Sequence, residues 1–374
     1  MRPFGSDIYS QEYNSRGRAG GDDMDWGRRG MIAGAVAGGI MLGAPLPPAA
    51  MARDITDMAG HAVSVPDHPD RIADLWFAHN ELLLMLGGAD RVVMTVDRPQ
   101  ARPWMYRVFP ALYRAQAVNG PQVNAETLLR ERVDLVFVPE ASATIAAFRA
   151  VGVPVLVSSF QDVDGLLRVV DMTATALGTE AARATAAQYR TLMRQTVSDV
   201  RERLSTIADS ARPRVLHIQS LHPLRVDGAH SIVDEWITLA GGRNAAVGVE
   251  GNMKPVSAEQ IAAWDPDVII LGPDSGALDT AADGGMWQKL RAVRTGRVLN
   301  NPSGVFPWDR YGSELPLQIR WAAKALHPDR FADTDPVGMT CDFYRTYFHY
   351  DLSRADAQRI LAGQPPQPAA GAGQ

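Results

Sequence analysis

A long stretch without any strand signal divides this chain and restricts the folds open to it. From Val163 to about Ser210 there is no β-rich run, and residues 181–211 carry apolar side chains three and four positions apart. This spacing predicts one α-helix of roughly 30 residues, about 45 Å long at 1.5 Å per residue. Such a helix would be a stiff strut between two halves of the molecule, limiting how far they can close.

The sequence on both sides of this stretch alternates strands with helices. Before it, a helix capped by Asn124 leads into the β-rich run Val133–Val138, and after it RPRVLHIQS reads as a strand. The segments NAETLLRERVDLVFVPE and SAEQIAAWDPDVIILGP share one pattern, which indicates lobes of the same plan or a chance recurrence of a common βαβ unit. We predict an α/β protein with two Rossmann-like lobes with parallel-rich sheets, joined by one long α-helix.

The length of 374 residues fits about two domains. We expect the Pro/Gly/Ala-rich tail to be disordered from about residue 362. The predicted organisation is a signal peptide over 1–52, an N-terminal α/β lobe over 53–162, a connecting backbone helix over 163–210, a C-terminal α/β lobe over 211–335 and a C-terminal extension over 336–374.

The N-terminus has the features of an export signal. Arg28 and Arg29 precede an uncharged, weakly hydrophobic run over 30–52, which ends at Ala52 in an A-x-A cleavage pattern. Twin arginines in this position predict a Tat-type signal. Prolines near the end of the run cut it below the ~20 apolar residues of a membrane span. No cysteine follows the cleavage site, so we expect a periplasmic protein that is not a lipoprotein.

Composition excludes several function classes. A net charge of -5 does not resemble the basic surface of a nucleic-acid binder. The single cysteine, Cys341, excludes an intramolecular disulfide and a CxxC site. The 8 histidines form no HxH or HExxH motif, which disfavours a metal site built from protein ligands alone. Any metal should therefore arrive already chelated.

Several stretches, in their order and spacing, resemble one known family. They include ELLLMLGGADRVVMTV, VNAETLLRERVDLVFVP, LAGGRNAA, VSAEQIAAWDPDVIILG and LRAVRTGRVLNNP. Over 53–335 the chain resembles the helical-backbone (class III) periplasmic binding proteins for ferric siderophores, haem and vitamin B12. The resemblance implies a ligand cleft between the lobes and a role as the receptor of an ABC importer, not as an enzyme.

The resemblance also implies a partner. In this family an exposed Glu on each lobe pairs with arginines of the inner-membrane permease dimer, and the matching positions are Glu126 and Glu259. The residues alone allow another reading, in which both carboxylates only stabilise the first turn of a helix through its dipole. We expect a monomer that is not embedded in the membrane.

Candidate ligand-binding residues lie in the loops that follow the predicted strands, where open α/β sheets bind ligands. Aromatic faces and Arg forks suit a bulky, partly anionic ligand. Trp104 could instead pack along its loop, and the arginines could be solvated. The candidates are Trp76, Phe77, His79, Arg98, Arg102 and Trp104 in the first lobe, and His222, Trp308, Arg310 and Tyr311 in the second.

Two of these histidines have a sharper interpretation. His79 and His222 could complete the coordination of a chelated metal, because imidazole suits Fe, Ni, Cu and Zn, or they could be structural. The expected ligand is a metal chelate, first a ferric siderophore, with a corrinoid, haem or nickel chelate as alternatives. No covalent cofactor is expected, and the chelated metal, iron first, belongs to the ligand.

Two other functions stay open. A binding lobe used for signalling would need the same cleft. A secreted α/β hydrolase would need the G-x-S-x-G elbow, but the nearest match has Pro273 in place of the first glycine, and Ser275 has no evident acid or base partner.

Overall fold

The computed structural model describes residues 52–278 and 284–367. Residues 1–51 of the predicted export signal and residues 368–374 of the predicted tail lie outside these ranges. In the described ranges, no helix is both long and apolar enough to cross a bilayer. The described chain begins with an antiparallel hairpin of β1 (Ala52–Thr56) and β2 (Ala62–Pro66).

The first lobe is built on a sheet of five parallel strands in the order β5-β4-β3-β6-β7. Runs of apolar residues such as LVFV in β6 are buried on both faces, as expected for a parallel sheet covered by helices. Its elements are β3 (Ile72–Asp74), α1 (Phe77–Met85), β4 (Val92–Thr95), α2 (Pro103–Val108), β5 (Gln116–Ala117), α3 (Ala125–Arg130), β6 (Leu135–Pro139), α4 (Ile145–Ala150) and β7 (Val155–Ser158).

The second lobe has a six-stranded mixed sheet in the order β11-β9-β8-β12-β13, with β10 also paired to β8. Strands β10, β8, β12 and β13 are parallel, whereas β9 and β11 are antiparallel to their neighbours. Its elements are β8 (Arg214–Leu221), β9 (Leu224–Val226), α7 (Ile232–Leu239), β10 (Arg243–Asn244), β11 (Lys254–Pro255), α8 (Ala258–Trp264), β12 (Val268–Leu271), α9 (Gly284–Trp287), α10 (Arg291–Arg294), β13 (Val298–Asn300) and α11 (Leu315–Leu326).

The two lobes repeat one plan. The parallel order β3-β6-β7 in the first sheet corresponds to β8-β12-β13 in the second. In both lobes a short capped helix leads into the middle strand of this trio. Asn124 accepts a hydrogen bond from the Thr127 amide at the start of α3, and Ser257 accepts one from the Gln260 amide at the start of α8. The two carboxylates predicted to dock, one in each helix, therefore occupy equivalent positions.

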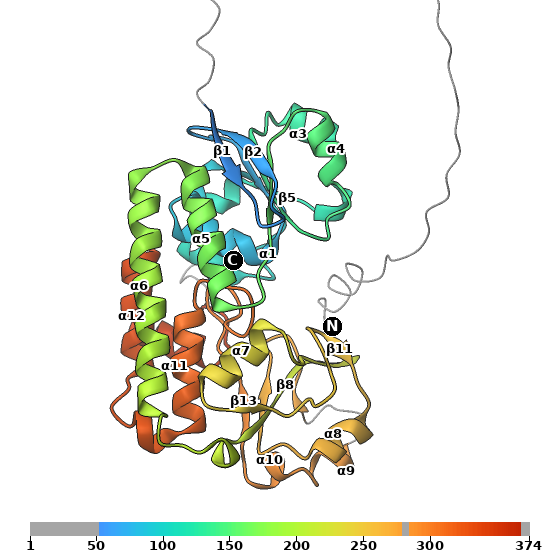
Figure 1. Cartoon of the computed structure of the whole chain (residues 1–374), viewed down its shortest axis with the longest axis vertical. Helices are drawn as coiled ribbons and strands as arrows, with labels where there is room; N and C mark the ends of the chain where they lie inside the picture. Colours follow the sequence, from blue (N-terminus) through green and yellow to red (C-terminus); the bar gives the residue numbers. More distant parts are fainter. Residues whose placement is uncertain (1–51, 279–283, 368–374) are drawn as a thin grey trace, which may run out of the picture. The chain divides into compact units, whose positions relative to one another are not determined.

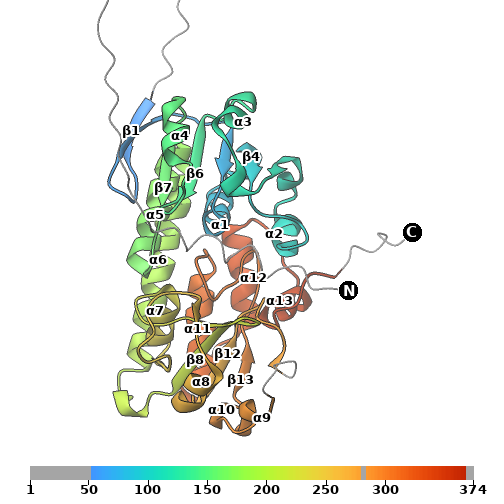
Figure 2. The same ribbon diagram turned by 90° about the vertical axis from the view of Figure 1, so that its right-hand side faces the viewer.

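The prediction of a single helix over 163–210 is wrong. The connection consists of α5 (Val163–Leu177) and α6 (Glu180–Arg203), which Figures 1 and 2 show running alongside α11 and α12. Gly178 ends α5 in a left-handed conformation with φ +75°, and Thr179 caps α6. A Cβ atom at Gly178 would collide with the Asp67 carbonyl oxygen, so the close approach of β2's loop requires glycine here.

The C-terminal segment contacts both lobes. Helices α12 (Pro336–Tyr347) and α13 (Arg354–Leu361) follow the second lobe, where the Tyr344 hydroxyl donates to Glu314 Oε1 at 2.8 Å. Beyond α13, the Gln364 carbonyl accepts from Trp104 Nε1 of the first lobe at 2.9 Å, and the Gln367 carbonyl accepts from Arg107 at 2.7 Å. The expectation of disorder from about residue 362 is therefore wrong for 362–367.

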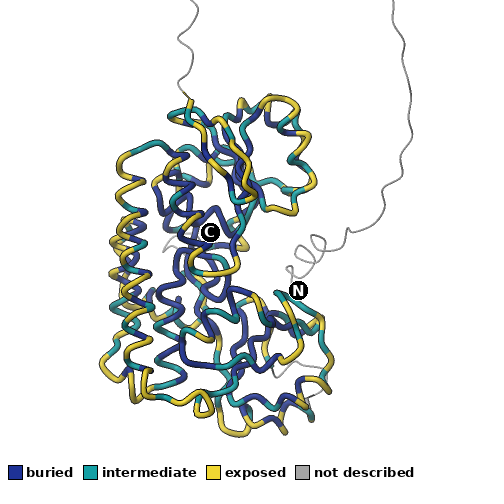
Figure 3. Tube along the Cα trace, viewed as in Figure 1, coloured by how far each residue is buried: buried dark blue, intermediate teal, exposed yellow. Residues whose placement is uncertain are grey.

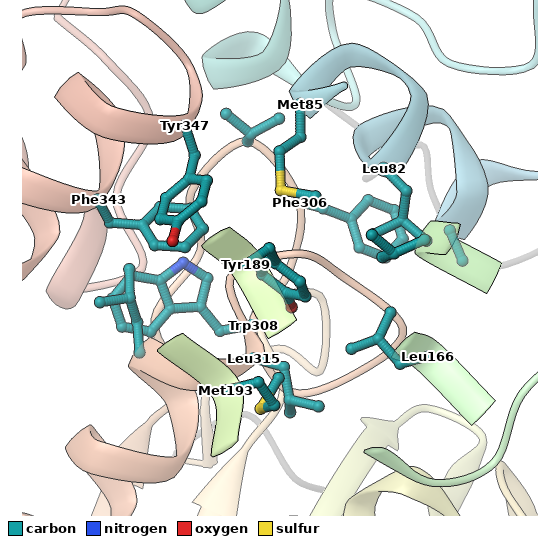
Figure 4. Packing of buried hydrophobic residues seen from close by; sticks show 14 of the residues in the cluster. Leu82, Met85, Leu166, Tyr189, Met193, Phe306, Trp308, Leu315, Phe343 and Tyr347 are labelled. Carbon is teal, nitrogen blue, oxygen red and sulfur yellow. The ribbon is translucent and has the colours of Figure 1, made fainter. Parts of the chain in front are cut away.

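The hydrophobic core joins the lobes. One cluster fills the far face of each sheet, and a third, larger cluster runs through both lobes, as the continuous buried segments in Figure 3 show. In Figure 4, side chains from α1, α5, α6, α12 and the loop before α11 meet in this third cluster, among them Leu82, Leu166, Tyr189, Trp308 and Phe343. Because the lobes share one packed interior, large independent movements would expose apolar surface.

A buried polar contact crosses the same interior. Glu81 of α1 accepts hydrogen bonds from the Ser313 amide at 2.9 Å and the Ser313 hydroxyl at 2.6 Å. Burial raises the pKa of Glu81 to about 7, against the hydrogen bonds from Ser313 that lower it. Burial also raises the pKa of Glu314 well above its usual value, and the nearby Glu81 raises it further.

Candidate functional site

Three aromatic side chains from both lobes meet where strands of the first sheet end. Trp76 caps α1 shortly after β3, Phe160 follows β7, and Tyr311 lies in the loop before α11 of the second lobe. The ring centroids of Trp76 and Phe160 are 5.7 Å apart, those of Trp76 and Tyr311 5.9 Å, and those of Phe160 and Tyr311 5.3 Å. We call these three residues the aromatic cluster.

Polar side chains extend the contact between the lobes. The Tyr311 hydroxyl donates to Gln161 Oε1 at 3.3 Å, immediately after Phe160 in the chain. Asn252, in the loop before β11, donates to the Tyr311 hydroxyl and, at 3.5 Å, to Gln161 Oε1. The facing rims of the two lobes are thus within side-chain reach of each other at this point.

Arg102, at the start of α2, also reaches across the lobes. Only 8% of its surface is exposed, and its guanidinium lies 3.8 Å from Asp97 of the first lobe and 3.7 Å from Asp274, which follows β12 of the second. The guanidinium carbon stands 5.0 Å from the ring centroid of Phe306, a cation–π contact. Burial raises the pKa of Asp97 to about 6, and the charge of Arg102 opposes this rise.

Arg310 is the second buried cation, with 7% of its surface exposed. Its Nε atom lies 3.3 Å from Asp309 Oδ1, and Gln219 at the end of β8 accepts from Nη1 at 3.2 Å in the amide orientation that satisfies both groups. Arg310 precedes Tyr311 of the aromatic cluster and follows Phe306, over which Arg102 stacks, by four residues. The two arginines therefore converge on one loop.

A chain of alternating charges supports Arg310 from below. Asp309 Oδ2 lies 3.1 Å from His217 Nε2, and His217 Nδ1 lies 2.7 Å from Asp227 Oδ2. Burial opposes a charge on His217, but the hydrogen bonds to both aspartates outweigh it and raise its pKa to about 9. Burial likewise disfavours the charged form of Asp309, yet Arg310 and His217 lower its pKa. Arg310 is thus held by a buried, electrostatically balanced network.

This geometry can bind an anion. Guanidinium groups from facing lobes, each fixed by a carboxylate, present planar donor forks that match oxyanions or carboxylates. The adjoining aromatic cluster supplies rigid apolar contact area. In the described ranges, no group of three or more His, Cys, Asp or Glu side chains is placed to hold a metal ion.

The structure brings together four of the predicted site residues, namely Trp76, Arg102, Arg310 and Tyr311. Phe77 is half-buried beside Trp76 at the start of α1. Arg98 is exposed in the turn between β4 and α2, and His222 is exposed in the turn between β8 and β9. Ser275 of the hydrolase alternative donates its hydroxyl to the Gly276 carbonyl at 3.1 Å.

Three predicted contacts with ligand are wrong because the side chains lie in the core. His79 is fully buried, and its ring nitrogens lie 2.6 Å from Asp74 Oδ2 and 2.8 Å from Thr173 Oγ1, so neither is available to a ligand or a chelated metal. Trp104 is 2% exposed, and its indole nitrogen binds the C-terminal segment. Trp308 is 1% exposed and belongs to the core shared by the lobes (Figure 4).

Sequence reasoning missed several residues of the site. Phe160 and Gln161 follow β7 as Trp76 follows β3, so the same rule about loops after strands could have found them. Asn252 and Asp274 lie in loops of ordinary turn composition. Gln219 lies within a strand, and nothing in its local sequence distinguishes it from other half-buried strand residues.

The two predicted docking carboxylates are both exposed. Glu126 lies in the first turn of α3 and Glu259 in the first turn of α8. A hydrogen bond from the Ser257 side chain, and one from its own backbone, lower the pKa of Glu259. Both carboxylates are thus presented to solvent at corresponding helix starts of the two lobes.

Comparisons with known proteins agree with this architecture. The sequence profile of the periplasmic binding protein family matches residues 78–303. The molybdate-binding protein MolA of Haemophilus influenzae is 26% identical over 342 residues, covering 82% of this chain and 94% of MolA. A cobalamin-binding protein of Halobacterium salinarum is 28% identical over 261 residues, covering 65% of this chain and 66% of that protein.

A solved structure extends the comparison to the whole fold. The crystal structure of a periplasmic solute-binding protein from Veillonella parvula has a TM-score of 0.72 and 26% identity, and the match covers 83% of this chain and 97% of that one. The family profile spans more than half of the chain and includes strands of both lobes. The chain therefore belongs to the periplasmic binding protein family, in the helical-backbone class that serves ABC importers.

Proposed function

We propose that this protein is the receptor of an ABC importer for a compact, metal-containing anion, which it holds between its lobes and delivers to an inner-membrane permease. The observation that carries the proposal is the pair of buried arginines, Arg102 and Arg310, at the facing rims of the two lobes. Burying two cations there is costly unless opposite charge stabilises them, and an anionic ligand adds to that stabilisation.

The closeness of the lobes supports a small ligand. The aromatic cluster and the contacts among Gln161, Asn252 and Tyr311 join the rims, and the shared core resists wide opening. A tetrahedral oxyanion such as molybdate or tungstate suits this space and the two guanidinium forks. MolA, which matches this chain over most of both lengths, is a molybdate-binding protein.

An anionic ferric siderophore is the second candidate. The aromatic cluster favours it, because Trp76 and Tyr311 could stack on catechol rings beside the same arginines. Iron would then be the metal, carried within the ligand. The cobalamin-binding relative keeps corrinoids among the alternatives, with haem and nickel chelates.

Isothermal titration calorimetry of the exported, processed protein tests these candidates. Molybdate, tungstate, sulfate and phosphate are compared at one ionic strength with a ferric catecholate, cobalamin and haem. We expect molybdate and tungstate to bind with a Kd of about 1 μM or tighter. Binding of a chelate but of none of the four oxyanions would overturn the compact anion, and no binding by any compound would overturn the receptor role.

We further propose that Glu126 and Glu259 pair with arginines of the permease dimer. Their equivalent positions on α3 and α8 give each lobe one exposed carboxylate, as a two-subunit partner requires. Charge pairs of this kind mainly set the register and rate of association. Export through a Tat signal, without a lipid anchor, would place the receptor free in the periplasm, where we expect it to act as a monomer without catalysing a reaction.

A further inference from the structure

A cavity lined by arginines opens at the other edge of the second sheet. It has a volume of about 490 Å³. Five arginines and one carboxylate are among its lining residues: Arg212, Arg214, Arg243, Arg291, Arg297 and Asp267. We call it the arginine cavity. Neither the proposed ligand site nor the docking carboxylates include any of these residues.

Strand topology explains why these residues meet. Arg214 is the first residue of β8 and lies opposite Arg243 of β10 in the parallel register. Asp267 directly precedes β12, and Arg297 directly precedes β13. Because β10, β8, β12 and β13 are parallel neighbours, their amino ends share one edge of the sheet. The candidate ligand site lies at the carboxyl ends of β8 and β12, so the two sites are at opposite edges.

The cavity carries positive charge that the protein leaves uncompensated. Arg291 pairs with Asp267 at 2.9 Å, and Arg212 lies 3.8 Å from Asp209. Within 52–278 and 284–367, no carboxylate lies within the 4.0 Å of an ion pair from Arg214, Arg243 or Arg297. In a chain with a net charge of -5, three such arginines in one hollow are a marked local reversal of sign.

Backbone carbonyls hold two of the three arginines in place. Arg243 Nε donates to the Arg212 carbonyl at 3.2 Å, and Arg297 Nη2 donates to the Ala325 carbonyl at 3.2 Å. Nearby His327 reports the resulting potential, because its pKa is lowered first by burial and then by Arg297, Arg212 and Arg330. The guanidinium groups are therefore partly ordered before any ligand arrives, which reduces the entropy lost on binding.

We propose that the arginine cavity is a second binding site, for a small polyanion with at least two phosphate groups. Guanidinium forks from three neighbouring strands can each pair with phosphate oxygens, and a single small anion could not reach all three. The phosphate groups could belong to a free oligophosphate or to the headgroup of a diphosphate lipid. The site is independent of the importer ligand and can be occupied at the same time.

Calorimetry with inorganic pyrophosphate at low ionic strength tests the proposal on the full protein. The test variant combines Arg214→Gln, Arg243→Gln and Arg297→Gln. A matched control combines Arg183→Gln, Arg194→Gln and Arg201→Gln, which removes the same charge from the exposed face of α6. We expect the parent and the control to bind alike and the test variant to bind at least about 100-fold more weakly, from roughly tenfold for each charged hydrogen-bonding group. Far-UV circular dichroism and thermal unfolding check that both variants fold.

Two further arms decide the source and the independence of the site. Co-sedimentation with phosphatidylcholine vesicles, with and without cardiolipin, identifies a lipid source if only cardiolipin vesicles retain the parent and the test variant stays in solution. Saturating molybdate should leave pyrophosphate affinity unchanged. The proposal is overturned if neither probe binds the parent protein, if the test variant binds like the parent, if the α6 control loses as much affinity, or if molybdate displaces pyrophosphate.

Discussion

The carboxylate of Glu81, on α1 of the first lobe, lies 2.6 Å from the hydroxyl of Ser313 in the second lobe. Both residues are fully buried, and the contact crosses the interior that the lobes share. Burial raises the pKa of Glu81 to about 7, so near neutral pH this lobe-to-lobe hydrogen bond changes its protonation state. Stability should therefore depend on pH in a definite direction.

We predict that the free energy of unfolding falls as pH rises from about 4.5 to about 7, because the folded state holds a proton on Glu81 that the unfolded state has released. The slope for one proton is at most about 1.4 kcal/mol per pH unit. Glu81→Gln keeps the hydrogen-bonding shape without the titration and should flatten the profile. Urea unfolding at several pH values in this window measures it, and an unchanged slope in the variant would show that Glu81 is already ionised in the folded protein.

Arg102→Gln and Arg310→Gln should each weaken binding of the importer ligand roughly 10- to 100-fold, the usual loss for a charged hydrogen bond. Arg98→Gln is the matched control, because Arg98 is exposed in the turn that leads to Arg102. Calorimetry with molybdate measures all three, and thermal unfolding reports whether loss of Arg310 disturbs the Asp309–His217 network. Equal losses in all three variants would point to a general charge effect instead of a site.

Ligand binding should change tryptophan fluorescence mainly through Trp76. This ring is half-buried and contacts Phe160 and Tyr311, whereas Trp308 is 1% exposed within the core. Trp76→Phe should remove most of the ligand-dependent change, and Trp308→Phe should keep it. Titration of both variants with the ligand identified by calorimetry checks this, and a full response from Trp76→Phe would place the ligand elsewhere.

Removing the docking carboxylates should separate transport from binding. We expect the double substitution Glu126→Ala with Glu259→Ala to abolish uptake by cells while ligand affinity stays unchanged, because both side chains are exposed and far along the chain from the arginines. Glu180→Ala with Glu202→Ala, on the exposed face of α6, is the control for lost negative charge. A drop in affinity would instead put Glu126 or Glu259 in contact with ligand.

Gly178→Ala should destabilise the protein by about 1–3 kcal/mol or more, since a side chain there is strained at φ +75° and collides with the Asp67 carbonyl. Gly152→Ala isolates the strain, because φ is +77° but nothing lies within 4 Å of its Cβ position. Urea unfolding compares the two. Similar losses would mean that the loop at Asp67 yields to a methyl group and that the packing of α5 against β2 is loose.

The architecture of the lobes was predictable because it depends on local patterns. The alternation of capped helices with β-rich runs marked α3–β6 and α8–β12. The break at Gly178 was not foreseen, since one glycine within a helical pattern is compatible with an unbroken helix. Its effect depends on the approach of Asp67, a residue distant in sequence.

The site was predictable only in part, because the same loops hold both core and rim residues. Arg102 and Trp104 are two positions apart, yet the first reaches Asp274 and the second binds the Gln364 carbonyl. Arg310 and Trp308 divide in the same way. Which side of a loop faces the partner lobe is decided by long-range packing, and neither composition nor periodicity contains that information.

The hydrogen bonds from Trp104 to Gln364 and from Arg107 to Gln367 have a consequence for biosynthesis. The residues that complete the first lobe are among the last that the ribosome adds, so this lobe cannot reach its final packing while translation continues. A nonsense codon in the final α13 region would leave an early-made lobe without its closing partner, and nascent chains of this protein should stay sensitive to protease until release.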